Sequence, residues 1–121
     1  MVIEVPLSLE EALVKREFDR VPLTTSFRFR RREDGDVPFI ESAPVHADVS
    51  VVGVFVPTKW HFPADTRVEV EFTLPRRVLP LQLNGRVVWS GTVTKGTGMG
   101  IAFRRLDARE RQAIRRYAVG K

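Results

Sequence analysis

The sequence predicts a mainly β domain: five or six short antiparallel strands, forming a closed barrel or a sandwich, followed by one C-terminal helix. Apolar and polar residues alternate with a period of two in several runs, which is typical of half-buried strands. Gly, Pro, Asp and Asn separate these runs at intervals of about 8–14 residues. No long helical pattern stands between the runs, which argues against a doubly wound nucleotide-binding fold. A chain of 121 residues has the length of one domain.

The first element we expect is a short helix within the N-terminal segment, residues 1–20. Ser8 and Glu11 have the spacing of a capping box, and apolar residues follow at helical intervals. Pro22 ends this pattern, because the residue before a proline avoids the helical region. So short a helix depends for its stability on the surface against which it packs.

A strand pattern begins at Leu23. Leu23, Phe27 and Phe29 would share the buried face of this strand, and the polar residues between them would face outward. The Asp34-Gly35 pair that follows predicts a hairpin turn. We expect further extended runs at residues 45–57, 67–75, 81–90 and 98–106.

Two stretches near the end of the strand region break the regular pattern. Asn84-Gly85 is compatible either with a tight turn or with a bulge in a strand that continues through Ser90. Residues 91–98, which are rich in Gly and Thr, predict a loop. The strand region as a whole is expected to span residues 21–106.

The chain ends in a predicted helix over residues 107–119. Asp107 is a good N-cap, Glu110 stands at the capping-box position, and Gly120 provides a stop. Ile114 and Tyr117 share one face of this helix, which predicts that they pack against the strands.

Composition narrows the class of protein without choosing a function. Cysteine is absent, which excludes disulfides and thiolate metal sites and fits a cytoplasmic location. No apolar run approaches the roughly 20 residues needed to span a bilayer, so we expect no membrane insertion, and the acidic N-terminus is unlike a secretion signal. The net charge is +5, and all basic residues except four lysines are arginines. This excess is explained equally well by an anionic partner or by codon usage on a solvated surface.

No arrangement of residues predicts catalysis or a metal. Gly98-Met-Gly100-Ile-Ala-Phe103 lacks the third glycine of a dinucleotide fingerprint and opens a strand, and no serine stands in a nucleophile-elbow motif. Glu69 and Glu71, two residues apart on a strand, indicate a solvated face. The two histidines cannot alone form a zinc site. We therefore expect no enzyme activity, no catalytic residue, no metal and no cofactor.

Two short patterns stand out in order along the chain. Arg16 and Arg20 are four residues apart, immediately before the first strand, so both can reach one ligand. Asp48 and Ser50 would lie on the same side of the second extended run, and Gly53 follows them. A carboxylate can accept hydrogen bonds from a guanine edge, a hydroxyl can add one, and a glycine permits close approach.

These patterns together resemble the PilZ domain family, whose hallmarks are RxxxR before the first strand and [D/N]xSxxG after it. The resemblance extends from Lys15 to about Val119 and includes Leu74-Pro75, the segments GRVVW and GMGIAF, and the closing helix. It implies a six-stranded antiparallel β-barrel with a C-terminal helix, in a single domain over residues 1–121. It also implies a cytoplasmic receptor for the bacterial second messenger cyclic di-GMP.

By this resemblance, Arg16 and Arg20 would contact the phosphates and guanine faces, and Asp48 and Ser50 would read a guanine edge. Gly53 would leave room for the ligand. Lys15 would face a second, stacked ligand molecule. Ligand binding would reorder the N-terminal segment and so relay the signal to a downstream protein that the sequence does not identify.

Structural interpretations of the same residues stay open. Arg16 and Arg20 would then lie on an exposed helix face, paired with Glu17 or Asp19, and Asp48 and Ser50 would belong to a β-turn or form a hydrogen-bonded pair at a strand end. Val51 and Val52 depart from the small residues common in the family, and they would stiffen the turn before Gly53.

Two alternative functions follow. The first is a PilZ-like protein-interaction module that does not bind the nucleotide. The second is general nucleic-acid binding, which ranks lowest because the strands offer few paired exposed aromatics for stacking on bases.

Overall fold

The computed structural model describes residues 20–34, 38–59, 62–93 and 96–120. The N-terminal helix expected before Pro22 lies outside the described residues, as do Lys15 and Arg16.

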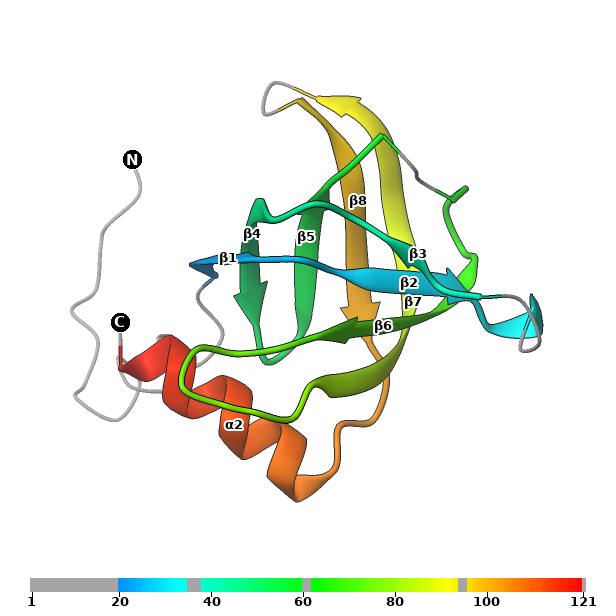
Figure 1. The fold of residues 1–121 in the computed structure, drawn as a ribbon. Coiled ribbons are helices and arrows are strands. Elements are labelled where there is room, and N and C mark those ends of the chain that lie inside the picture. The colour runs from blue at the N-terminus through cyan, green and yellow to red at the C-terminus, as the bar shows by residue number, and fades with distance from the viewer. Residues whose placement is uncertain (1–19, 35–37, 60–61, 94–95, 121) are drawn as a thin grey trace, which may run out of the picture.

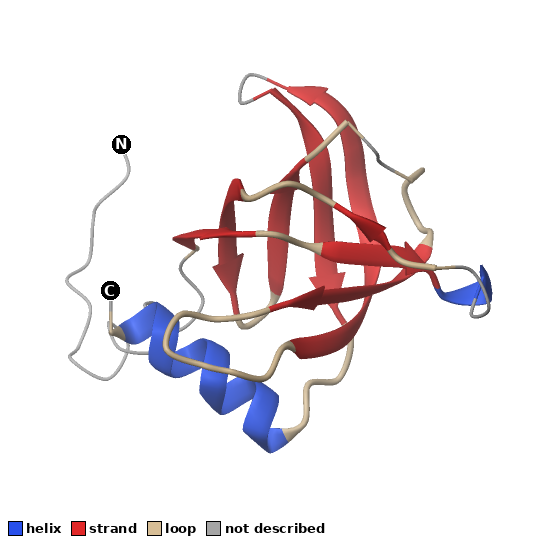
Figure 2. Ribbon diagram, in the orientation of Figure 1, coloured by secondary structure: helices blue, strands red, loops and turns tan. Residues whose placement is uncertain are grey.

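The described chain forms one antiparallel sheet and one α-helix (Figure 2). The sheet has eight strands in the order β1-β4-β5-β8-β7-β6-β2-β3. The strands are β1 (Val21–Thr25), β2 (Arg28–Arg31), β3 (Ile40–Glu41), β4 (Val45–Ser50), β5 (Gly53–Pro57), β6 (Arg67–Phe72), β7 (Leu81–Val93) and β8 (Gly96–Phe103). A 3-10 turn, η1 (Arg32–Asp34), follows β2, and α2 (Ala108–Val119) ends the described chain.

The expected closed six-stranded barrel is corrected by this topology. β1 and β2 belong to one extended run, interrupted only at Ser26 and Phe27, yet β1 pairs with β4 and β2 pairs with β6. The same run therefore stands at one end of the sheet and near the other, so the sheet must curl around its core. In Figure 1 this run crosses in front of β5 and β8. Among the described residues no ladder joins the two edge strands, β1 and β3, so the sheet is not closed.

Two local expectations are also corrected, and one open alternative is decided. The extended run predicted at residues 45–57 is a hairpin, because the chain turns at Val51 and Val52 between β4 and β5. At Asn84-Gly85 the continuing strand is confirmed, since β7 passes through both residues and through Ser90 without a turn, while the irregularity in its pairing falls between Val87 and Trp89. Most of the loop predicted at residues 91–98 is strand, since the β7–β8 ladder extends to the pair Val93 and Gly96.

The hairpin predicted near Asp34-Gly35 is present as the antiparallel pair β2–β3, in which Phe29 stands opposite Ile40. Its turn falls partly outside the described residues. Ser42 donates its backbone N–H to Phe27 O (2.8 Å), and its Oγ accepts from Phe27 N (2.9 Å). These two bonds hold the end of β3 against the run that links β1 and β2.

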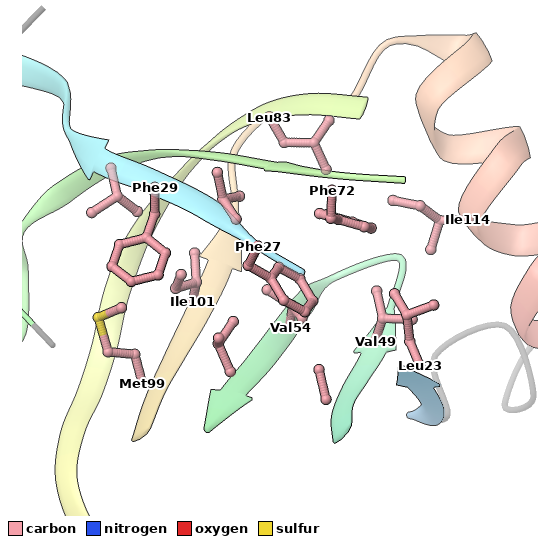
Figure 3. Packing of buried hydrophobic residues seen from close by; sticks show 14 of the residues in the cluster. Leu23, Phe27, Phe29, Val49, Val54, Phe72, Leu83, Met99, Ile101 and Ile114 are labelled. Carbon is pink, nitrogen blue, oxygen red and sulfur yellow. The ribbon is translucent and has the colours of Figure 1, made fainter. Parts of the chain in front are cut away.

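The core lies within the curl of the sheet, and it confirms the predicted alternation. Leu23, Phe27 and Phe29 are buried, while Thr24 and Arg28 between them are exposed. Figure 3 shows these side chains facing those of β5, β8 and α2. Other core residues with 2% exposure or less are Ala47, Val49, Val54, Val56, Val68, Val70, Phe72, Leu74, Leu83, Val87, Met99, Ile101 and Ile114.

The C-terminal helix forms as predicted. The Asp107 side chain accepts from Glu110 N (2.7 Å), and the Glu110 side chain accepts from Asp107 N (2.9 Å), which completes the capping box. Gly120 caps the other end of α2. Ile114 is fully buried in the core cluster, so α2 covers an end of the curled sheet (Figure 1).

Replacing Ile114 by Ala should lower the free energy of unfolding by about 2–5 kcal/mol, because it removes buried methyl groups and leaves a cavity between α2 and the sheet. Chemical denaturation monitored by circular dichroism measures this. Arg109→Ala, at an exposed position of the same helix, should stay within about 0.5 kcal/mol of the wild type. Equal effects of the two substitutions would contradict the packing described for α2.

Candidate functional site

The Asp48 side chain projects from the outer face of β4. Its neighbours Ala47 and Val49 are buried in the core, so the period of the strand directs Asp48 away from it. Pro22 of β1 and Phe55 of β5 stand opposite Asp48 on either side. The carboxylate is half-buried on this surface.

The structure brings Arg20 to the same face. Arg20 is exposed and directly precedes β1. Val21 pairs with Val49 and Pro22 with Asp48, and Arg20 and Ser50 each lie one residue beyond the last pair of this ladder. Arg20 stands two residues before Pro22 in the extended chain, and both residues are exposed on the outer side of the sheet. Arg20, Asp48 and Ser50 are therefore gathered at one end of the β1–β4 pair, whereas the predicted partners Arg16 and Lys15 lie outside the described residues.

Ser50 has a structural part in this arrangement. It is fully buried, and its Oγ accepts a hydrogen bond from Val52 N at 3.2 Å. This bond holds the turn that separates β4 from β5. Of the two valines in that turn, Val51 enters the core and Val52 is 48% exposed.

Gly53 begins β5 at a point of close approach between strands. It pairs with Ser50 on one side and with Ala102 of β8 on the other. A Cβ atom at this position would overlap the carbonyl oxygen of Ile101. The absence of a side chain is thus required by the β5–β8 contact itself, independently of any ligand.

An aromatic pair that the sequence did not reveal lies next to Asp48. Phe55 stacks on Trp89 with ring centroids 5.2 Å apart and an interplanar angle of 20°. The rings meet over Gly100, where a Cβ atom would overlap the indole of Trp89, and a Cβ at Gly98 would come within 2.8 Å of the Phe55 ring. The repeated glycines of β8 therefore make room for an aromatic surface beside the carboxylate.

The register places these groups in one row across five strands. Pro22, Asp48, Phe55, Gly100 and Trp89 stand opposite one another in turn on β1, β4, β5, β8 and β7. The row offers the carboxylate of Asp48, the partly exposed indole of Trp89 on the buried Phe55 and, at its edge, the guanidinium of Arg20. These groups suit a planar ligand that has hydrogen-bond donors on its edge and carries negative charge.

A second feature connects this surface to α2. The Tyr117 hydroxyl donates a hydrogen bond to the carbonyl oxygen of Pro22, two residues after Arg20. Tyr117 also lines a groove of about 1080 Å³ between the end of α2 and the loop before β7. Val78 and Leu79, which line the same groove, are 94% and 77% exposed.

The described residues hold no group of three or more His, Cys, Asp or Glu side chains placed to bind a metal ion. Within the same part of the chain, no helix is both long enough and apolar enough to cross a membrane.

The family model described as "PilZ domain" matches residues 14–120. No curated protein matches the sequence. Among solved structures, the chain is similar to the inhibitor of motility MotI/DgrA from Bacillus subtilis, with a TM-score of 0.65 and 15% identity over 87% of this chain. The match covers 50% of that protein, so this chain spans about half its length.

A second similar structure is a tetrameric PilZ domain from Xanthomonas campestris, described as self-assembled through a helical bundle. Its TM-score is 0.62 at 16% identity, and the match covers 91% of this chain and 93% of that one. At these identities the two likenesses show the fold.

Gly53→Ala should lower the free energy of unfolding by about 1–3 kcal/mol, because the added methyl group forces β5 and β8 apart. Val52→Ala in the same turn, at a half-exposed position, is the control and should change stability by less than about 0.5 kcal/mol. Thermal unfolding of the ligand-free proteins measures both. A Gly53→Ala protein as stable as the wild type would show that the glycine is not needed for packing.

Proposed function

This chain belongs to the PilZ domain family, and we propose that it binds cyclic di-GMP on the outer face of β1, β4 and β5. The observation that carries this proposal is the register of β1 on β4, which gathers Arg20 and Asp48 from distant parts of the sequence onto one surface. Both residues belong to the motifs that mark ligand-binding members of the family.

Arg20 supplies the positive charge in this proposal. Its side chain is exposed, and it makes no ion pair with any of the described residues. A guanidinium can donate two parallel hydrogen bonds to a phosphate and can stack on a purine face. Arg16, four residues earlier, is proposed to act in the same way, and Lys15 to face a second ligand molecule.

Asp48 supplies the group that reads the base. A carboxylate accepts hydrogen bonds from the N1–H and N2–H of guanine, which adenine cannot offer in the same pattern. Trp89, which stacks on the buried Phe55 beside Asp48, is partly exposed and gives the purine an apolar surface. Ser50 and Gly53 are proposed to lie beneath the ligand, where the bond from Val52 N to Ser50 and the bare backbone of Gly53 shape the surface.

The output of binding is proposed to pass through the segment that carries RxxxR. This segment runs into Pro22, whose carbonyl oxygen accepts the hydrogen bond from Tyr117 of α2. Reordering of the segment would therefore change the groove at the end of α2, where Val78 and Leu79 are exposed. A groove with exposed aliphatic side chains among arginines fits a downstream protein that presents apolar and acidic residues.

The alternative is an interaction module that keeps the fold and does not bind the nucleotide. One specific observation favours it: Ser50 and Gly53 have structural tasks that explain their presence without a ligand. The groove lined by Tyr117 would serve this function equally. The two functions differ in their response to cyclic di-GMP, which only the first requires.

Cyclic di-GMP should bind the purified protein in calorimetry, GTP should not displace it, and single-stranded DNA should not bind at the same concentrations. Arg20→Ala and Asp48→Ala should each weaken binding about 10- to 100-fold, as the loss of a paired contact to a base or phosphate does. Arg109→Ala removes an equal charge at an exposed site and should leave the affinity unchanged.

The melting temperatures of the ligand-free variants complete that experiment. Arg20→Ala should melt at the wild-type temperature, because its proposed contacts are with the ligand, and Asp48→Ala should lower the affinity by more than it lowers the stability of the free protein. No heat with cyclic di-GMP at high micromolar protein concentration would refute the receptor function and leave the interaction module.

Tyr117→Phe should leave the binding of cyclic di-GMP intact and abolish its proposed effect on the end of α2. The substitution removes the hydroxyl that bonds to Pro22 and keeps the ring. The variant should bind cyclic di-GMP with wild-type affinity but should lose the ligand-dependent change in hydrogen exchange expected at residues 115–120. Mass spectrometry of the exchanged protein, with and without ligand, measures this change. An unaltered ligand response in the variant would exclude this route for the signal.

A further inference from the structure

A second cationic surface lies on the outer face of the sheet, away from the groups assigned to cyclic di-GMP. Arg67 begins β6, Arg86 lies in β7, and Arg104 follows β8. The three arginines line one hollow of about 320 Å³, together with Ala102 and Phe103. The volume is at the lower end of the range for small-ligand sites, so it suits part of a small molecule.

Backbone pairing fixes this convergence. Arg67 stands directly opposite Arg86 in the β6–β7 ladder. Arg104 N donates to Asn84 O (2.8 Å), which holds Arg104 two residues from Arg86. Val87 N donates to Thr66 O (2.9 Å) and secures the start of β6. The hollow is therefore built on strands and on hydrogen-bonded backbone.

Two arginines of β2, the other neighbour of β6, are paired with glutamates, unlike those of the cluster. On the other side of β6, Arg30 Nε lies 2.6 Å from Glu69 Oε2, and Arg28 Nη1 lies 3.5 Å from Glu71 Oε1. At each of these positions an arginine of β2 faces a glutamate of β6. Arg67 of β6 differs, because the residue opposite it on β7 is another arginine, Arg86.

The like-charge pair has a cost that no described side chain offsets. Like charges directly opposite each other on adjacent strands are destabilising. Within the described ranges, none of the three arginines forms an ion pair, and Asp65, two residues before Arg67, makes none with them. A bound anion would remove the repulsion and would accept hydrogen bonds from several guanidinium groups at once.

We propose that the cluster of Arg67, Arg86 and Arg104 is a binding site for a pyrophosphate group, such as that of a nucleoside diphosphate. Two linked phosphates concentrate several negative charges within a few ångströms, and their oxygens match the paired donors of guanidinium. A lone carboxylate would leave most of these donors unpaired. The confined hollow disfavours a nucleic-acid strand, which needs a longer charged track.

This site does not depend on the proposed cyclic di-GMP function. It shares a face with that surface but none of its residues. Ser50, Gly53, Ala102, Arg86 and Arg67 form one row across β4, β5, β8, β7 and β6, with the cluster at the far end.

Calorimetry with inorganic pyrophosphate, ADP and GDP, at about 50 mM salt, tests the proposal on the full chain. We expect all three to bind, guanosine not to bind, and affinity to fall as salt is raised. Arg67→Ala and Arg86→Ala should each weaken binding about 10- to 100-fold. The double variant Arg77→Ala/Arg109→Ala removes two other exposed arginines and should bind as the wild type does.

Arg86→Glu gives a second, independent measurement. It replaces the like-charge pair with an opposite-charge pair, so the ligand-free variant should melt at or above the wild-type temperature while binding of pyrophosphate is lost. Asp48→Ala should leave pyrophosphate binding unchanged.

Four results would overturn the proposal. These are no binding of pyrophosphate, ADP or GDP at millimolar concentration, an equal loss in Arg77→Ala/Arg109→Ala, binding of single-stranded DNA alone through the cluster, and a loss of pyrophosphate binding in Asp48→Ala. The last result would make the cluster part of the Asp48 surface. Absence of cyclic di-GMP binding with pyrophosphate binding intact would refute the receptor function and leave this site standing.

Discussion

The antiparallel pairing of β1 with β4 is the interaction on which the rest of the structure depends. Because β1 continues directly into β2, which pairs with β6, this one run holds both halves of the sheet around a common core. The same pairing carries Leu23 inward and Pro22 outward, opposite Asp48. It also presents the carbonyl of Pro22 to Tyr117. Fold, candidate site and helix attachment therefore share one register, and a slip by one residue would reverse all three.

Local patterns in the sequence predicted the elements whose causes are local. The period of two at Leu23, Phe27 and Phe29 identifies a buried face because side chains in a strand alternate. Asp107 and Glu110 identify a helix start because the capping box satisfies backbone donors within four residues. The place of Asp48 and Ser50 on one face followed in the same way. Their proximity to Arg20 depends on pairing between distant strands, which a motif can suggest only through resemblance to a family.

The sequence predictions that were wrong share a different cause: pairing between strands outweighed the local conformational preference of the residues. Val51 and Val52 have strong β propensity, yet they form a turn, because Ser50 Oγ binds Val52 N and Gly53 lets β5 approach β8. Residues 91–98 read as a loop, yet most of them extend the β7–β8 ladder. Trp89 stands two residues after the buried Val87, so in a regular strand it would face the core as Val87 does. The irregularity between these two residues turns Trp89 to the outer face, beside Gly100.

The arginine excess acquires a spatial meaning from this topology. On β2, Arg28 and Arg30 neutralise glutamates of β6 and so belong to the sheet itself. Across β6, the Arg67–Arg86 pair has no such partner among the described residues, and four strand spacings separate Ser50 from Arg67 along the row. At about 4.8 Å per spacing this separation is about 19 Å, which is about twice the screening length of roughly 10 Å in 0.1 M salt. The two proposed anion sites would therefore bind independently at that ionic strength and would lower each other's affinity only in dilute salt, where the screening length reaches about 30 Å at 0.01 M.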